Sequence, residues 1–338
     1  MSERPGGRVA PAESAIEVPE VYYELPPALA TNAAAWIDSG QAPAPSKDAS
    51  TVMLLRDGSD AGLPAGAGSA GAGSAGAGSA GAGTPGGLEV FVLHRAATMA
   101  FAPSVYVFPG GGVDARDADE TLPWAGPSPA QWAARLAAPT QAQARELVVA
   151  AARELFEECG VLLAGPDADT VVADLTGPEW DDARAALIGR DLSFAEFLVQ
   201  RGLVLRTDLL RAVDHWITPE FEPRRYDTRF FVAALPAGQV PDDDCTEAEH
   251  VRWVRPADLL AEQRAGSALL LPPTEVCLRR LEPASADSLG GDWDGSVAGV
   301  LAALDDPTPL PVVLPVAVRT DHGVRLLRTW VPPAPGPA

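Results

Sequence analysis

Three glutamates near the middle of the chain, Glu154, Glu157 and Glu158, have the residue type and spacing that could bind a divalent cation. Segment 141–161 reads as one helix, because apolar residues recur in it at intervals of three and four. At about 100° per residue, the three carboxylates lie within an arc of roughly 100° along the edge of the apolar face. Like charges this close cost about 0.2–0.5 kcal/mol per pair. An arrangement that costs stability in this way indicates a functional role, most simply the binding of a divalent cation.

The plain alternative is a solvent-exposed acidic helix face, in which Arg153 pairs with Glu157 one turn away. An upstream segment argues against it, because a β-rich run over 105–108 enters a proline and three glycines, among them Gly110 and Gly111. Such a turn presents bare backbone that a ligand can approach closely. We therefore expect the glutamates and the glycine turn to belong to one ligand site.

Together the two segments resemble the Nudix box, in which a glycine and a glutamate precede the sequence Arg-Glu-apolar-any-Glu-Glu-any-Gly-apolar. Residues 153–161 match that second half at every position. The resemblance implies that Glu154, Glu157 and Glu158 bind Mg²⁺ or Mn²⁺. It also implies that Arg153, Glu157 and Glu158 act in catalysis.

The first half of the box departs from the family pattern. Counting forward from Gly111, the glycine of the motif, Asp117 stands at the glutamate position. It lies far more than seven residues before Arg153, the arginine of the motif. Counting back from that arginine, the position holds Arg145, with Glu146 beside it. Residues 115–140 therefore read as an insertion in the box. Glu146 points to the side of the helix that carries the glutamates, so we expect it to supply the missing carboxylate.

A basic and aromatic cluster over 215–231 predicts the substrate half of the site. Its residues Arg224, Arg225 and Arg229 could bind phosphates in a bidentate manner, with ion pairing to neighbouring acids as an equal alternative. The sequences Trp-Ile-Thr-Pro and Arg-Arg-Tyr-Asp-Thr-Arg-Phe-Phe in this cluster, with the interrupted box, look like the peroxisomal coenzyme A diphosphatase-like branch of the Nudix family. That branch splits coenzyme A and its esters at the pyrophosphate. The box glycines Gly110 and Gly111 would adjoin the substrate.

The general base is open among three glutamates. Glu158 is one candidate. Many relatives use a glutamate from a distant loop, and here Glu247 and Glu249 lie in a loop before a predicted strand. For these two, an exposed acidic loop is the plainer interpretation. His215 lies inside a strand pattern and reads as a packed histidine.

Strands interleaved with helices indicate an α+β fold with a mixed sheet. The resemblance implies the Nudix αβα sandwich, with the box helix on one face of the sheet. We divide the chain into a loosely ordered segment 1–47, a Nudix hydrolase domain 48–283 and a C-terminal extension 284–338. A low-complexity loop rich in Gly, Ala and Ser spans 57–87. Two amphipathic helices are expected over 181–210, so the domain carries helical insertions.

Composition and charge limit the classes of partner that the chain could bind. The 338 residues carry a formal net charge of −21, which would repel a nucleic-acid polymer. The three cysteines lack metal-ligand spacing and suit a reducing compartment. The sequence shows neither a signal-peptide core nor an apolar run long enough to cross a membrane. We expect a cytoplasmic protein, with its oligomeric state open and a homodimer as one alternative.

These features predict a metal-dependent hydrolase that cleaves the pyrophosphate bond of a nucleoside-diphosphate-linked small molecule. The preferred candidate substrates are coenzyme A and acyl-coenzyme A, with ADP-ribose, NADH and nucleotide sugars as alternatives. The rival is a non-catalytic nucleotide-sensing module. Arg145 at the glutamate position favours the rival, whereas the intact Arg-Glu and Glu-Glu pairs of the box favour an enzyme.

Overall fold

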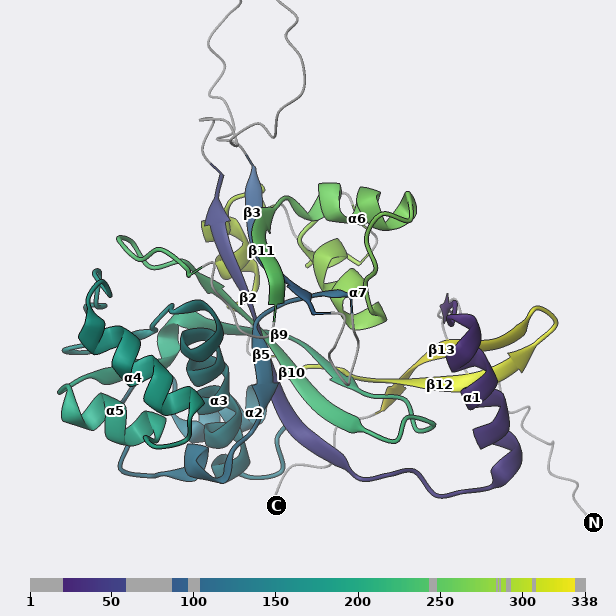
Figure 1. The fold of residues 1–338 in the computed structure, drawn as a ribbon, viewed down its shortest axis with the longest axis horizontal. Helices are drawn as coiled ribbons and strands as arrows, with labels where there is room; N and C mark the ends of the chain where they lie inside the picture. Colours follow the sequence, from purple (N-terminus) through teal and green to yellow (C-terminus); the bar gives the residue numbers. More distant parts are fainter. Residues whose placement is uncertain are drawn as a thin grey trace, which may run out of the picture.

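A mixed β-sheet runs through the centre of the molecule and carries helices on both faces (Figure 1). The computed structural model describes residues 21–58, 87–96, 104–242, 248–283, 285, 287–289, 293–305 and 308–331. Among these residues, ten strands form the central sheet and three short strands form a second one. The predicted α+β architecture is confirmed.

The central sheet has the strand order β1-β13-β12-β9-β10-β2-β3-β11, with β4 paired to β3 and β5 paired to β2. Its strands are β1 (Tyr22–Tyr23), β2 (Ser46–Asp57), β3 (Leu88–Arg95), β4 (Tyr106–Val107), β5 (Gly110–Gly112), β9 (Leu210–Ile217), β10 (Arg225–Ala234), β11 (Ala248–Val254), β12 (Val312–Thr320) and β13 (Gly323–Val331). The second sheet holds β6 (Trp124–Ala125), β7 (Ala164–Gly165) and β8 (Val204–Arg206). The central sheet is mixed because β10 runs parallel to β2, and β12 parallel to β9, while its other pairs are antiparallel.

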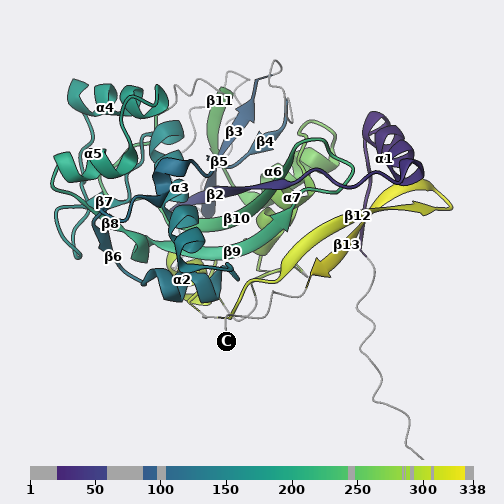
Figure 2. The same cartoon turned by 90° about the horizontal axis from the view of Figure 1, so that it is seen from below.

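Helices form the outer layers. They are α1 (Pro27–Ser39), α2 (Pro129–Arg135), α3 (Gln141–Cys159), α4 (Pro178–Ile188), α5 (Phe194–Gln200), α6 (Pro256–Arg264), α7 (Pro272–Arg280) and α8 (Val297–Ala303), with 3₁₀ turns η1 (Ala115–Ala118) and η2 (Thr207–Leu209). Helices α2 and α3 pack on one face of the central sheet, and α6, α7 and α8 on the other (Figures 1 and 2). Within the described ranges, no helix is both long and apolar enough to cross a membrane.

Strand β2 lies in the middle of this sandwich and is apolar on both faces. Val52 and Leu54 join the core beneath α3, whereas Met53 and Leu55 join the core beneath α7. Continuous apolar residues are typical of a strand that is covered on both faces, and alternation fixes which side chain enters which core. Nearer its start, the Ser50 hydroxyl donates a hydrogen bond of 2.7 Å to a backbone carbonyl of α3. The box helix is thereby fixed to the central strand.

The ends of α3 follow from two local signals. Thr140 caps the first turn, where its Oγ1 accepts a hydrogen bond from the Gln143 amide at 3.1 Å. Gly160 ends the helix in the left-handed region, with φ of 67°, a conformation that glycine adopts without strain.

Two apolar faces of α3 are buried at once. Leu147 and Leu155 pack against the sheet, and Val149 and Phe156 pack against α4 and α5. The stacked rings of Phe156 and Phe197 lie 5.1 Å apart. Only the remaining stripe of the helix is left for polar side chains, and this stripe carries the box glutamates.

Both ends of the described chain extend the same sheet. Residues 21–47, which we expected to be loosely ordered, hold β1, α1 and the start of β2. Residues 308–331 of the expected C-terminal extension contain β12 and β13, which join the sheet through β9. Helix α1 lies beside this hairpin (Figure 2). Residues 1–20, and 59–86 of the Gly/Ala/Ser-rich loop, fall outside the described part of the chain.

The segments around the box helix differ in part from expectation. The predicted insertion 115–140 contains η1, β6 and α2. The two helices predicted over 181–210 are present as α4 and α5, but the second ends at Gln200. The prediction was wrong for the residues that follow, because the backbone of β8 pairs with β6 and β7.

Trp132 of the insertion tests how firmly α2 is held on the sheet. Its side chain is 1% exposed and meets Phe231 of β10 edge-on, with ring centroids 5.9 Å apart. We expect Trp132→Ala to lower the free energy of unfolding by about 3–5 kcal/mol, because it leaves a cavity in the core. Trp330, which is 45% exposed, provides the matched control, and its alanine variant should lose less than about 1 kcal/mol. Chemical denaturation measures both, and equal losses would contradict the expectation.

Candidate active site

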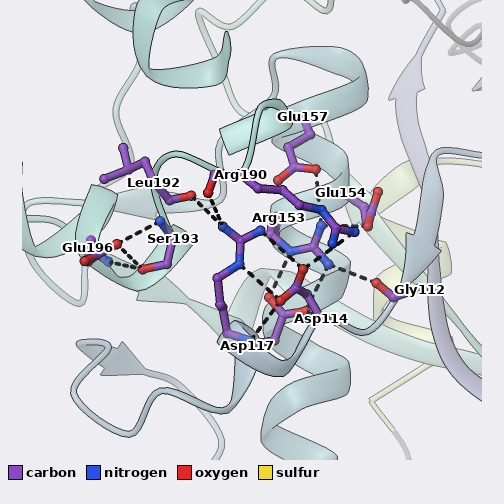
Figure 3. A network of polar contacts seen from close by, with 11 residues as sticks. Gly112, Asp114, Asp117, Arg153, Glu154, Glu157, Arg190, Leu192, Ser193 and Glu196 are labelled. Atoms are coloured by element: carbon purple, nitrogen blue, oxygen red, sulfur yellow. Dashed lines mark hydrogen bonds and ion pairs between the residues drawn. The ribbon is translucent and has the colours of Figure 1, made fainter. Parts of the chain in front are cut away.

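The buried guanidinium group of Arg153 organises the polar stripe of α3 (Figure 3). Its Nε and Nη2 donate to the two carboxylate oxygens of Asp117 at 2.8 and 2.9 Å. Nη2 also donates to the Gly112 carbonyl at 3.0 Å, and Nη1 donates to Glu154 at 2.7 Å and Glu157 at 3.2 Å. These contacts use all five donors of the group. Burial opposes the charge, but the hydrogen bonds to Asp117 and the nearby carboxylates raise the pKa of Arg153, which stays positive.

Asp117 supplies the carboxylate that the first half of the box requires. Its side chain is 1% exposed, and its Oδ2 also accepts a hydrogen bond from the Asp114 amide at 2.8 Å. Asp114 in turn caps η1 through the Arg116 amide at 3.0 Å. The forward count from the motif glycine therefore located the partner of Arg153. The expectation that Glu146 would take this place was wrong, because the insertion separates the two halves of the box in sequence but not in space.

Arg145, the residue at the glutamate position in the backward count, has a structural role. Its guanidinium donates to the carbonyls of Asp119 and Leu122, at 2.8 and 3.1 Å, and lies 5.1 Å from the ring centroid of Trp124. It thus holds the inserted segment against α3. Its neighbour Glu146 is part-buried, and burial, followed by the charges of nearby aspartates, raises the pKa of Glu146.

Two of the three box glutamates, Glu154 and Glu158, lie beside the glycine turn, and Glu157 is bonded to Arg153. Glu158 accepts a hydrogen bond from the Gly110 amide at 2.8 Å. The Glu154 carboxylate packs on Gly111, where an added Cβ would come within 2.6 Å of it. Only glycine leaves room for the carboxylate there. Burial raises the pKa of Glu154 to about 7 against the opposing effect of the neighbouring arginine, and burial also raises the pKa of Glu157.

The donor set fits a hard divalent cation. Across the described ranges, no three His, Cys, Asp or Glu side chains stand close enough to hold a metal ion as they are placed, because Glu154 and Glu157 both turn toward Arg153. The groups beside the turn are nevertheless all carboxylate oxygens, which Mg²⁺ and Mn²⁺ prefer. The raised pKa values of Glu154 and Glu157 mean that the cost of burying these two carboxylates is not fully compensated, and a bound cation would compensate it. The residues present therefore suit the expected metal.

Two of the three arginines predicted to bind phosphates form contacts within the protein. Arg225 is 9% exposed and donates to two backbone carbonyls, at 3.0 and 2.7 Å. Arg229 is 2% exposed and pairs with Asp227, and with Asp48 at 3.5 Å. Of the three predicted arginines, Arg224 is the exposed one. The structural alternative thus describes Arg225 and Arg229, which corrects the expectation that all three are available to a ligand.

The candidate bases from the distant loop are only partly described. Glu247 falls outside the described residues. Glu249 is 48% exposed and lies on β11, where its Oε2 is 3.3 Å from Nδ1 of His94. His215 is 3% exposed and bonded to Asp227, as expected of a packed histidine, and burial lowers its pKa.

A cavity of about 350 Å³ opens on the face of the sheet that α3 covers. Its lining includes Arg56, Phe91, Gln239, Arg252 and Trp253. The box glutamates are not among its lining residues, and we therefore do not assign this cavity to the carboxylate site.

A solved structure shows which class of fold this is. The crystal structure of a NUDIX hydrolase from Alicyclobacillus acidocaldarius superposes with a TM-score of 0.56 and 24% sequence identity, covering 76% of this chain and 96% of that one. The chain therefore has the Nudix fold, and the predicted αβα sandwich is confirmed.

Sequence comparisons match part of the chain to a known family. Residues 130–281 match the family model described as the NUDT19 Nudix domain. The Caenorhabditis elegans protein "Putative nudix hydrolase 7" is 28% identical over 206 residues, 61% of this chain and 58% of that protein. Acyl-coenzyme A diphosphatase NUDT19 of Xenopus laevis is 23% identical over 230 residues, 57% of this chain and 59% of that protein. The chain spans about three fifths of the length of these relatives. The matched part of the chain resembles the Nudix hydrolases, and in particular the branch that contains these diphosphatases.

The pairing of Asp117 with Arg153 can be tested directly. Asp117→Asn should lower the free energy of unfolding by about 3–5 kcal/mol, because it leaves a buried guanidinium without its main counter-charge. Glu146→Gln, on the same helix stripe, should change it by less than about 1 kcal/mol. Denaturant titrations of both variants measure the difference. A large loss in Glu146→Gln, with little in Asp117→Asn, would return the motif role to Glu146.

Proposed function

We propose that the chain is a metal-dependent hydrolase that cleaves the pyrophosphate bond of a nucleoside-diphosphate-linked small molecule, with coenzyme A and its acyl esters as the first candidates. The observation that carries the proposal is the placement of Glu154 and Glu158 at the glycine turn of Gly110 and Gly111, with Glu157 bonded to the same arginine as Glu154. The name of the Xenopus laevis relative, acyl-coenzyme A diphosphatase, supports the substrate class. Because this chain matches only part of that relative, the activity of the whole protein belongs to the proposal.

Charge explains why a metal would be needed. A pyrophosphate is anionic, and the chain has a net charge of −21, so the substrate must be neutralised locally. Mg²⁺ or Mn²⁺ on Glu154, Glu157 and Glu158 would supply that neutralisation and lower the pKa of an attacking water. All five N–H donors of Arg153 are engaged within the protein. Its role is therefore to position Glu154 and Glu157, and not to bind the substrate.

The remaining roles follow from exposure and contacts. We assign the general base to Glu158, with Glu249 of β11 and Glu247 as alternatives. Its bond to the Gly110 amide places the Glu158 carboxylate at the turn where the substrate would lie. Of the basic cluster, we keep only Arg224 for the substrate phosphates, since Arg225 and Arg229 are engaged elsewhere.

The rival function, nucleotide sensing without catalysis, loses its main support. That support was Arg145 at the position of the motif glutamate, which left the box without a carboxylate there. Asp117 provides the carboxylate, and Arg145 braces the insertion. The sensing module therefore becomes one outcome of the substrate test.

Product release should be measured with Mg²⁺ or Mn²⁺ across coenzyme A, acetyl-coenzyme A, ADP-ribose, NADH and UDP-glucose. We expect metal-dependent cleavage of coenzyme A compounds, reduced at least about 100-fold in Glu157→Gln, because one metal ligand and its charge are lost. Glu120→Gln removes an exposed carboxylate outside the site and is the matched control. Ligand binding without cleavage of any compound would favour the sensing module.

Metal binding should also stabilise the fold without substrate. At a Mg²⁺ concentration of about 100 times Kd, ligand linkage adds about 2.7 kcal/mol to the free energy of unfolding. Thermal unfolding with and without Mg²⁺ should show this gain in the wild-type chain and in Glu120→Gln. Glu157→Gln should lose most of it, and an undiminished gain in that variant would place the metal elsewhere.

A further inference from the structure

The last turn of α3 is an unfavourable place for acidic residues. Its final carbonyl groups have no N–H partner within the helix, and the helix dipole adds partial negative charge at this end. Glu157 and Glu158 bring two carboxylates to the same turn. A group from outside the helix is needed to offset this charge.

Arg184 of α4 meets the carbonyl groups of these same two residues. Its Nε donates to the Glu157 carbonyl at 2.8 Å, and its Nη2 donates to the Glu158 carbonyl at 3.1 Å. Its Nη1 pairs with the carboxylate of Asp242, whose own amide donates to the Cys159 carbonyl at 2.8 Å. Three consecutive carbonyl groups at the end of α3 thus receive donors from two other segments. The Arg184 side chain is only 14% exposed, so solvent weakens these contacts little.

Packing fixes the position from which Arg184 reaches the helix. Its neighbours Ala183 and Leu187 on α4 lie in one apolar cluster with Val149 and Phe156 of α3. The α4–α5 pair is also tied to the first half of the box. Arg116, which follows Asp114 in η1, donates to the carbonyls of residues 190 and 192 between the two helices, at 3.1 and 3.3 Å (Figure 3).

We propose that Arg184 is a positioning residue for the metal site. It fixes the backbone of Glu157 and Glu158, and hence the directions of their side chains, and its positive charge lowers the electrostatic cost of the acidic turn. Helix α4 therefore serves the proposed site from outside the box, through hydrogen bonds to its backbone. This inference rests on the proposed metal-dependent function.

Calorimetric titration of the full chain with Mn²⁺, without substrate, tests the role. Arg184→Gln should raise the Mn²⁺ dissociation constant about tenfold, as loss of a group that orients metal ligands commonly does. Arg184→Lys keeps the charge but lacks the planar fork whose Nε and Nη2 reach the two carbonyls, so it should raise the constant about threefold. Arg201→Gln is the matched control, because Arg201 bonds the Glu179 carbonyl and stacks on Trp180, both within α4.

The outcomes separate the two proposals. Unchanged Mn²⁺ affinity in Arg184→Gln, with only a lower unfolding temperature, would make Arg184 a structural cap and overturn the inference while leaving the hydrolase proposal intact. If Arg184→Gln does not fold, wild-type affinity in Arg184→Lys would overturn it. A wild-type chain that binds no Mn²⁺ would overturn both proposals. If hydrolysis is found, Arg184→Gln should raise the Mg²⁺ concentration for half-activation and leave the KM for substrate at saturating metal unchanged.

Discussion

The structure depends on one buried positive charge. The guanidinium of Arg153 can remain in the interior only while its donors are satisfied, and an unpaired charge there would be strongly destabilising. Its acceptors come from η1, from β5 and from α3 itself. These three elements are therefore held in one arrangement by a group that never needs to meet the substrate. Glu154 and Glu157 are thereby oriented by a positive charge that belongs to the protein itself.

The rest of the fold holds this charge in place. Because α3 buries one apolar face against the sheet and another against α4 and α5, it has no freedom to rotate, and its third face must carry the polar groups. Strand β2 fixes the helix through Ser50 and pairs with the glycine strand β5. A neutral replacement of the same shape could stabilise such a site more, since buried ion pairs are often no better than apolar packing. We infer that the role of these charges is to orient the groups around them rather than to add stability.

Contacts between residues close together in the sequence could be predicted from its periodicity, whereas contacts between residues far apart in the sequence could not. Glu154, Glu157 and Glu158 share one helix with Arg153, so helical periodicity placed them together. Asp117 lies 36 residues before Arg153, and no periodicity spans the strand and helix between them. Whether Arg225 or Arg229 meets a phosphate or an internal acceptor depends on strand pairing, which the local sequence does not contain. The contact of Arg184 with α3 likewise needs the packed helix pair.

The insertion within the box has a consequence for how such proteins can change. The contact between Asp117 and Arg153 fixes one end of the inserted segment, and the Thr140 cap fixes the other. A surface loop of this segment, outside the packed helix α2, could lengthen without moving the contact between Asp117 and Arg153, because each doubling of a flexible loop costs only about 0.6 kcal/mol in closure entropy. The motif is then defined by where its parts meet and not by the number of residues between them. A search with fixed spacing would overlook the first half of such a box, although Asp117 still meets Arg153.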